Sequence, residues 1–562
     1  MIPSNMIENI GKYDRLLKSA MEEFRQDSIV SRIVEKDHTV WKPDPSEISN
    51  RLGWLDCPKT MRTAIPELAD FVCDIRDAGF KRAVLLGMGG SSLAPEVFRL
   101  VFGVKDGYLD LTVLDCTHPD RIFEVEHIIE PKTTLFIVST KSGGTIETLS
   151  LMRYFYKYLS GQIGRGDTGS HFIAITDPGS GLEKTARELN FRKTFLNDPD
   201  IGGRFAALSY FGFVPAALLG IDLDKLLEKA EMMSQRCFSE EDNPGALLGV
   251  AIGEPANHDR DKLTFVISEK IAPFGAWVEQ LIAESTGKDG KGILPVVGEK
   301  LMEPVHYSDN RLFVHVKLKN DSSYDDDLIR LRDAGHPVIE IELGNPYDLG
   351  AEFFRWEMAI AIAGWRLKIN PFDQPNVESA KILAKEMIAA FERSGKLPMI
   401  KPFLADDDIE VFGEISAKSA TEALAVFSES AKIEGVYVAI QAYLKPSLQM
   451  DEALEVLRSN IARKYRVATT VGYGPRFLHS TGQLHKGDGG NGLFVILTDS
   501  PERELAIPQT ATGEDSSVSF GVLIAAQASG DMQALQYGKR KVIRFHLKSE
   551  PSKCIRKLAT GI

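Results

Sequence analysis

The chain has 562 residues, which at about 100–200 residues per domain corresponds to three or four domains. Hydrophobic residues make up 43% and charged residues 26%, a balance that excludes a disordered or collagen-like chain. Sixty-six Lys and Arg against 79 Asp and Glu give a net charge of −13. This argues against broad nucleic-acid binding, because a phosphate backbone repels a negative surface, but a locally positive pocket can still bind an anionic small molecule.

Cysteine use and hydropathy predict a soluble protein of a reducing, cytoplasmic compartment. The five cysteines are odd in number and none forms a CxxC pair, which disfavours a disulfide framework and a structural zinc site. The N-terminal residues contain no apolar core of a secretory signal. The longest apolar stretch, from Phe211 to Ile221, is interrupted by Pro215 and is too short to span a bilayer.

Residues 1–50 are predicted to form a polar, helical N-terminal segment, and residues 51–245 a first α/β domain. In this domain short continuous apolar strands alternate with helices, which is typical of a parallel sheet covered on both faces. The expected strands are 82–86, 111–114, 134–139 and 172–176, and the expected helices are 96–101, 146–159 and 181–189.

The same alternation returns in residues 246–402, which are predicted to form a second α/β domain. The expected strands are 263–267, 312–318 and 337–343, with helices at 277–285 and 352–367. The expected fold class is therefore α/β, with two tandem three-layer α/β/α units built on parallel sheets.

Residues 403–562 follow an acidic stretch and are predicted to form an extra C-terminal α+β unit. The pattern gives a strand at 437–444, a helix at 451–464, strands at 467–472 and 492–498, a helix at 520–537 and a strand at 541–547. This β-α-β-β-α-β order predicts a ferredoxin-like arrangement.

The first motif with chemical meaning is GMGGSS, residues 87–92, between a buried strand and a helix. Glycines let the backbone approach a phosphate, and the helix start offers free N–H groups, so Gly90 and Ser91 are candidate phosphate contacts. Asp115 ends the next strand, a spacing also found in dinucleotide sites. Ser92 stands where the third glycine of that fingerprint belongs, which disfavours a nicotinamide cofactor; a plain βα turn is the other alternative.

The second motif, STKSGGTIET at residues 139–148, again lies between a strand and a helix. Hydroxyls and backbone N–H groups at a helix start form an anion nest, to which a lysine adds charge. The spacing does not fit a P-loop and favours a monophosphate. A cluster of helix-capping hydroxyls would explain one or two of these side chains but not the whole set. The candidate ligands are Thr140, Lys141, Ser142 and Thr145.

These two motifs resemble the phosphate-binding loops of sugar-isomerase (SIS) domains, and three further segments resemble the glucose-6-phosphate isomerase family. The segments are GGRF at 202–205, QLIAESTGK at 280–288 and NPFDQPNVE at 370–378 followed by Lys381. All five occur in the family's order, over about residues 40–390. The resemblance implies two SIS-type units and an aldose–ketose isomerase that interconverts glucose 6-phosphate and fructose 6-phosphate. It also implies a catalytic role for Glu284, Lys381 and Arg204, and sugar contacts from Gln280 and Gln374.

The histidine of the family's ring-opening step has no match in the expected interval, which holds His306, His315 and His336. The segment LHSTGQ, residues 478–483, is similar to the HSxGQ segment of bacterial isomerases and makes His479 the candidate. It lies in the C-terminal unit, as in the isomerase half of bacterial transaldolase–isomerase fusions, which this chain resembles. His485 is the alternative.

The resemblance implies a mechanism without metal or cofactor. His479 and Lys381 would open the sugar ring, Glu284 would carry a proton between C2 and C1, and Arg204 would stabilise the enediolate. We find no HxH, HxxxH or carboxylate–histidine cluster for metal-dependent isomerisation.

Two other functions are kept as alternatives. Another SIS-fold enzyme, such as an aminotransferase, usually needs an ammonia-producing domain with an N-terminal cysteine, whereas this chain begins Met-Ile-Pro. A non-catalytic sugar-phosphate sensor would not need Glu284, Arg204 and Lys381 together. The expected partner is a hexose 6-phosphate, with no nucleic acid and no membrane. The resemblance further implies a homodimer and a functional link to a transaldolase.

Overall fold

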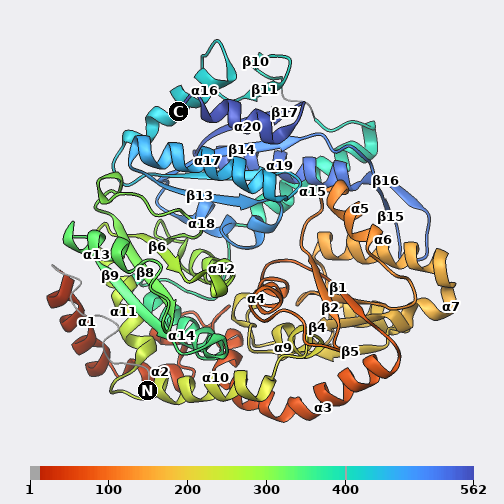
Figure 1. Ribbon diagram of the computed structural model, residues 1–562, viewed down its shortest axis with the longest axis horizontal. Helices are drawn as coiled ribbons and strands as arrows, with labels where there is room; N and C mark the ends of the chain where they lie inside the picture. Colours follow the sequence, from red (N-terminus) through yellow and green to blue (C-terminus); the bar gives the residue numbers. More distant parts are fainter. Residues whose placement is uncertain (1–12, 399–400) are drawn as a thin grey trace.

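The computed structural model describes residues 13–398 and 401–562, whose strands form three larger sheets and one short two-stranded pair (Figure 1). The predicted N-terminal helical segment appears as α1 (Asp14–Gln26) and α2 (Ile29–Val34), and residues 1–12 lie outside the described part. Among the described residues, no helix is long and apolar enough to cross a membrane.

The first sheet has five parallel strands in the order β2-β1-β3-β4-β5. Four are the predicted ones, β1 (Arg82–Gly87), β2 (Asp110–Leu114), β3 (Thr134–Ser139) and β4 (Phe172–Thr176), and β5 (Lys193–Leu196) is an unpredicted edge strand. The helices predicted around them are α4 (Leu93–Phe102), α6 (Ile146–Ile163) and α8 (Gly181–Glu188). The prediction of a buried parallel sheet is confirmed.

The second sheet is also parallel, in the order β7-β6-β8-β9. Its strands are β6 (Lys262–Ile267), β7 (Leu294–Val296), β8 (Arg311–Leu318) and β9 (Val338–Leu343), of which the three-residue β7 was not predicted. The predicted helices are present as α12 (Phe274–Thr286) and α14 (Leu349–Leu367).

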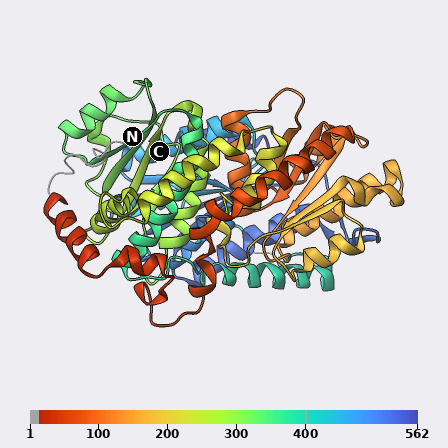
Figure 2. The same cartoon turned by 90° about the horizontal axis from the view of Figure 1, so that it is seen from below.

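The two sheets share one apolar core, so they are not independent of each other. This core runs through α3 (Cys57–Asp77), α9 (Tyr210–Leu218), α10 (Leu223–Cys237), α11 (Pro244–Ala256) and α14, together with the inner faces of both sheets. In Figure 2 these helices, coloured from red to green, run between the orange strands of the first sheet and the green strands of the second. Because α14 is buried along most of its length, it fixes the distance between the two units.

The C-terminal sheet corrects the ferredoxin-like prediction. Its order is β10-β11-β17-β14-β12-β13, and β12 (Tyr437–Tyr443), β13 (Ala468–Tyr473), β14 (Gly492–Asp499) and β17 (Lys541–Leu547) run mutually parallel. At one edge, β11 (Ile409–Phe412) pairs antiparallel with β17, and β10 (Leu404–Ala405) pairs antiparallel with β11. Parallel neighbours need a crossover connection. Between β13 and β14 this connection is the turn η12 (Arg476–His479) with α18 (Gly482–Gly487), for which the sequence pattern predicts no helix.

Helices cover the C-terminal sheet on both faces. The apolar core on one face is completed by α16 (Ala420–Ser428), α17 (Leu448–Tyr465) and α20 (Pro551–Ala559). On the other face α19 (Phe520–Tyr537) and α18 pack together with Ala283 of α12 and with β7. Phe520 and Leu523 of α19 also join the outer core of the first sheet, with Ile507 of the strand pair β15 (Ala506–Pro508) and β16 (Asp515–Ser519). The C-terminal unit therefore packs against both preceding units.

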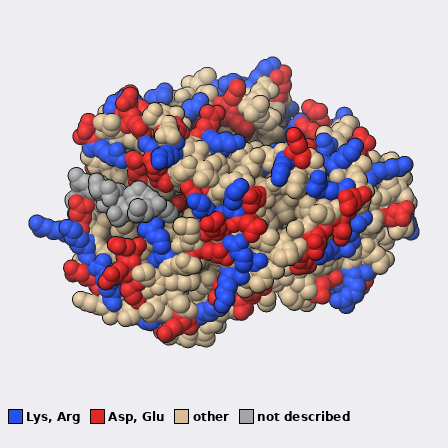
Figure 3. Space-filling model, turned by 60° about the horizontal axis from the view of Figure 1, so that its bottom comes forward, with Lys and Arg blue, Asp and Glu red and all other residues tan. Residues whose placement is uncertain are grey.

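Charge is mixed over the surface. On the face shown in Figure 3, basic and acidic side chains are interspersed, without a continuous field of one sign. The net charge of −13 is thus not concentrated in one patch on this face.

Candidate active site

All twelve predicted site residues line one cleft of about 540 Å³, where the three units meet. The first unit contributes the loops after β1 and β3 and the turn η7 (Gly203–Phe205), and the second contributes α12. Two further walls complete the cleft. One is α15 (Glu378–Ser394), which follows the second sheet, and the other is η12, which belongs to the C-terminal unit. The cleft lies at the carboxyl ends of β1 and β3, the edge where open parallel sheets bind ligands. The lining residues predicted from sequence are Gly90, Ser91, Thr140, Lys141, Ser142, Thr145, Arg204, Gln280, Glu284, Gln374, Lys381 and His479.

The glycine-rich turn after β1 is shaped by close contacts that leave no room for a side chain. A Cβ on Gly90 would lie 2.0 Å from the carbonyl oxygen of Gly203. Gly89 has a φ of +55°, and a Cβ there would lie 2.6 Å from the carbonyl oxygen of His479. The glycines thus bring η7 and η12 against the floor of the cleft, in addition to any phosphate role.

The loop after β3 gathers hydroxyls at the start of α6. Thr140 Oγ1 lies 3.0 Å from Thr145 Oγ1, and the N–H of Gly144 donates to Ser142 Oγ at 3.3 Å. The Lys141 ammonium donates to the carboxylate of Asp177 and to the Pro199 carbonyl at 2.8 Å. Free N–H groups at a helix start, hydroxyls and a lysine suit a monoanionic or dianionic phosphate.

Arg204 and Glu284 form the best-defined pair in the cleft. Arg204 Nη1 lies 3.3 Å from Glu284 Oε1, and both side chains are largely buried, at 2% and 14% exposure. The rest of the guanidinium donates to Ser285 Oγ at 2.7 Å and to carbonyls of the loop at residues 371–373. Burial lowers the pKa of Arg204, although the charge of Glu284 opposes this change. An arginine nevertheless stays protonated at neutral pH, so a fixed positive charge faces the carboxylate.

Gln280 connects Glu284 to His479. Its Nε2 donates to Glu284 Oε2 at 3.0 Å and to the His479 carbonyl at 2.7 Å. Gln280 and Glu284 are four residues apart on α12 and therefore face the same side. Gln280 Oε1 is buried and has no hydrogen-bond partner within the described chain, so it can accept a hydrogen bond from a sugar hydroxyl.

Glu147 and Gln527 were not predicted as site residues, and they line a hollow next to the cleft together with His479. His479 Nε2 lies 3.0 Å from Glu147 Oε1, which also accepts from Gln527 Nε2 at 2.6 Å. Burial raises the pKa of Glu147, but the charge of His479 and the hydrogen bonds outweigh it, and the pKa lies below its usual value. Glu147 belongs to the second motif, yet an acid in a first helical turn normally interacts with the helix dipole. No local signal in the sequence indicates Gln527.

Lys381 is the most exposed of the predicted catalytic residues. Its side chain is 47% exposed, and its Nζ lies 3.5 Å from Glu378 on the same helix. Gln374, before this helix, accepts from Arg204 Nη1 at 3.0 Å. Gln374 therefore reaches the cleft from the loop that Arg204 binds, and Lys381 reaches it from α15.

The alternative histidines lie elsewhere. His485 is 2% exposed, packs among the rings of Tyr437, Phe477 and Phe494, and bonds Gln441 at 3.2 Å. Burial holds its pKa well below the usual range. It does not line the cleft, and neither do His306, His315 and His336.

Lys288 is a further buried cation behind the cleft. Its Nζ lies 2.7 Å from Asp373 Oδ1 and braces the loop that Arg204 holds. Burial, together with repulsion from Arg204, lowers the pKa of Lys288 to about 8. This position closes the QLIAESTGK motif, so the motif's lysine supports the loop, while its glutamine and glutamate line the cleft.

Comparison with known proteins identifies similar chains. The family model described as phosphoglucose isomerase matches residues 76–293. The glucose-6-phosphate isomerase of Carboxydothermus hydrogenoformans is 30% identical over 397 residues, covering 59% of this chain and 83% of that protein. That of Thermus thermophilus is 28% identical over 403 residues, covering 61% and 91%. The solved glucose-6-phosphate isomerase of Chlamydia trachomatis has a TM-score of 0.56 at 19% identity, covering 67% of this chain and 86% of that one, which shows a shared fold.

Proposed function

This chain belongs to the glucose-6-phosphate isomerase family, and we propose that the cleft between its three units is where the reaction takes place. The protein is an aldose–ketose isomerase that interconverts glucose 6-phosphate and fructose 6-phosphate. The family predicted from the five sequence motifs is thereby confirmed. The roles of individual residues are our proposal.

One observation carries the assignment of the cleft. A single amide nitrogen, Nε2 of Gln280, bonds both the carboxylate of Glu284 and the carbonyl of His479. The two groups assigned to proton transfer at carbon and to ring opening are thus held in one fixed arrangement. Preorganisation of this kind lowers a barrier because the groups need not be ordered during the reaction.

In the proposed mechanism the hydroxyls and N–H groups at the start of α6, together with Ser91, hold the phosphate. Binding energy from this remote group orients the sugar. His479, held by Glu147, and Lys381 exchange protons with the ring oxygen and the O1 hydroxyl. Glu284 then moves a proton between C2 and C1. Arg204, whose charge faces Glu284 at 3.3 Å, stabilises the enediolate.

The C-terminal unit is proposed to supply His479 to the cleft of its own chain, because His479 lies in residues 403–562 and lines the cleft there. Formation of a homodimer and a functional link to a transaldolase stay predictions from resemblance. The proposed chemistry requires neither.

The experiment measures the turnover of fructose 6-phosphate. A coupled dehydrogenase that consumes the product, glucose 6-phosphate, reports the rate. Glu284→Gln is expected to lower kcat by about a thousandfold or more, because the substituted amide cannot accept the C2 proton. It should still be stabilised thermally by fructose 6-phosphate, which binds the folded state only. Glu269→Gln, at an exposed position outside the cleft, is the matched control and should retain full activity. Binding without turnover in the unmodified protein would instead favour the sugar-phosphate sensor.

A further inference from the structure

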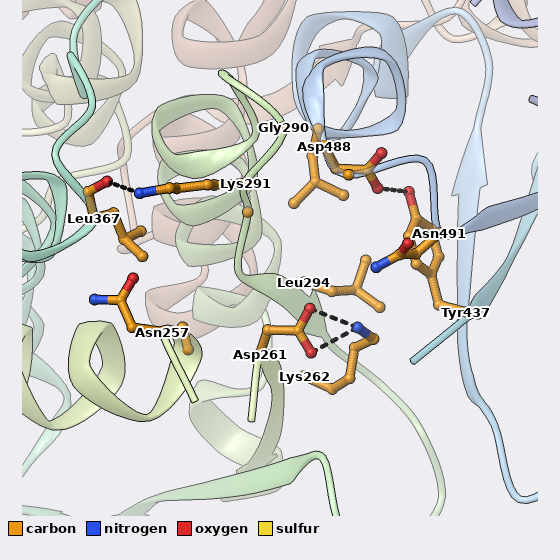
Figure 4. A pocket seen from close by; sticks show the side chains of 14 residues that line it. Asn257, Asp261, Lys262, Gly290, Lys291, Leu294, Leu367, Tyr437, Asp488 and Asn491 are labelled. Carbon is orange, nitrogen blue, oxygen red and sulfur yellow. Dashed lines mark hydrogen bonds and ion pairs between the residues drawn. The ribbon is translucent and has the colours of Figure 1, made fainter. Parts of the chain in front are cut away.

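Among the hollows outside the catalytic cleft, two at the C-terminal unit differ in how their charged side chains are partnered. The hollow shown in Figure 4 lies between the second unit and the C-terminal unit. There Lys262 Nζ bonds both oxygens of Asp261 at 2.7 Å, and Asp488 accepts from Tyr437 at 2.8 Å. Lys291 donates to the Leu367 carbonyl at 2.6 Å. Because these groups satisfy one another, the hollow gives no indication of a ligand.

The second hollow has about 590 Å³ and lies in the C-terminal unit. Thr498 and Asp499 at the end of β14, Tyr443 at the end of β12 and His546 near the end of β17 line it. It therefore occupies the carboxyl edge of a parallel sheet, where open α/β sheets bind ligands. Its volume is in the usual range for small-molecule sites, and apolar side chains of α19 such as Val522 and Ile524 form one wall.

Arg544 is a partly buried charge in this hollow that forms no ion pair within the described chain. Its Nε has no hydrogen-bond partner within the described chain, and its one hydrogen bond there is a long contact of 3.4 Å to Ser529 Oγ. The guanidinium carbon lies 4.0 Å from the centre of the Phe412 ring, a cation–π contact. Burial lowers the pKa of Arg544 to about 10, although the charge of Glu410 opposes this change. No described carboxylate oxygen lies within ion-pair distance of it.

Three acidic residues line the hollow, and none forms an ion pair with Arg544 within the described chain. Glu410, on the neighbouring strand β11, acts on Arg544 only through its charge. Asp499 bonds His118 Nε2 at 3.1 Å and so belongs to the contact with the first unit. Glu504 lies against the first turn of α19, because a Cβ on Gly521 would meet its Oε1 at 2.2 Å. A planar guanidinium with a free edge is the side chain best suited to a carboxylate or phosphate.

We propose that this hollow is a second binding site, for a small organic anion that places a carboxylate or phosphate on Arg544 and an apolar body against α19. The Ser529 hydroxyl lies 3.4 Å from Arg544 Nη1 and could add a contact to the anion, and Ser500 lines the same hollow. Arg544 and Ser529 do not line the catalytic cleft.

The position of α19 suggests what such a site does. Ser529 and Ala525 line the hollow, while Gln527 on another side of the same helix bonds the Glu147 carboxylate that holds His479. A ligand that moves α19 would therefore alter the histidine's support, and we expect occupancy to change kcat. This second expectation rests on the proposed function, whereas binding at the hollow does not.

The test uses anilinonaphthalene sulfonate, an anion on an apolar body, with saturating fructose 6-phosphate to occupy the cleft. We expect one saturable fluorescent site, and Arg544→Gln to weaken it at least tenfold, as loss of a hydrogen bond to a charged group does. Arg556→Gln, an exposed arginine of the same unit paired with Glu452, is the matched control and should bind normally. Displacement by benzoate or by phenyl phosphate tells whether the site prefers a carboxylate or a phosphate.

Ala525→Trp fills the hollow from an exposed position on α19 and leaves Arg544 in place. This variant tests binding at the hollow even if Arg544→Gln fails to fold. It should abolish binding. Unchanged binding in either folded variant, or displacement by neither competitor, would overturn the site. Normal binding with an unchanged kcat would overturn only the coupling through α19.

Discussion

His479 and Glu147 are 332 residues apart in the chain, yet their side chains meet at 3.0 Å, Nε2 to Oε1. The carboxylate is 4% exposed and the imidazole 19%, so this contact is made where the first unit and the C-terminal unit touch. With Nε2 committed to Glu147, we expect Nδ1 to be the nitrogen that faces the substrate. The acid therefore sets both the orientation and the tautomer of the histidine.

Glu147→Gln should lower kcat for ring-closed glucose 6-phosphate by about a hundredfold, the usual scale for one acid–base contribution. KM should change little, because the substituted amide leaves the hydroxyls of the phosphate loop in place. Steady-state kinetics from both directions of the reaction measure this split. Glu130→Gln, at an exposed position of the same unit, should be indistinguishable from the unmodified protein. A rise in KM alone would show that Glu147 supports the phosphate loop and not the histidine.

Because His479 reaches the cleft of its own chain, we expect that two inactive variants do not restore each other. Mixed Glu284→Gln and His479→Ala proteins, incubated together under conditions that allow subunits to exchange, should stay as inactive as each alone. If the histidine were shared between copies, mixing would recover up to about a quarter of the activity, as expected for random pairing. Specific activity of the unmodified protein should also be independent of its concentration, measured from nanomolar upward.

The sequence predicted the parallel sheets well because continuous apolar strands leave a strong local signal, as in β3, which is buried at every position. It also placed Gly90, Lys141 and Glu284 in the site, since each belongs to a motif whose residues are close in the chain. It missed β5 and β7, which are short edge strands, and the η12–α18 crossover, which has too few apolar residues to show helical periodicity. The contact of Gln527 with Glu147 could not be predicted from the sequence, because only the packing of α19 against the first unit brings the two side chains together.

Glu279, next to Gln280 on α12, provides a test of electrostatics behind the cleft. Burial raises its pKa to about 7, with the charges of Arg476 and Arg458 opposing this change. Between its usual value of 4.5 and about 7 the folded protein binds more protons than the unfolded chain, so this group's contribution to stability falls as pH rises through that window. Glu279→Gln removes the free-energy cost of ionising this buried carboxylate.

The variant should therefore gain stability over the unmodified protein between pH 5 and pH 8, by about 3 kcal/mol at most. Urea unfolding at both pH values measures the difference. A variant that is less stable at pH 8 than the unmodified protein would show that the ionised carboxylate is held favourably by the two arginines. Glu269→Gln is the exposed control and should show no pH-dependent gain.

Gly287, at the end of α12, tests whether docking of the C-terminal unit positions His479. A Cβ on Gly287 would lie 2.2 Å from Cα of Leu484 in α18, and backbone at this distance cannot move aside without shifting the helix. The backbone of Gly287 has a φ of −78°, so Gly287→Ala introduces no left-handed strain. Overpacking should cost about 1–3 kcal/mol in the free energy of unfolding, and kcat should fall because η12 and α18 are joined.

Urea unfolding and turnover measured on the same preparation check both effects. Gly161→Ala in α6, where a Cβ meets nothing within 4 Å, should be neutral or slightly stabilising and fully active. Normal stability and turnover in Gly287→Ala would mean that the contact between α12 and α18 does not position the histidine.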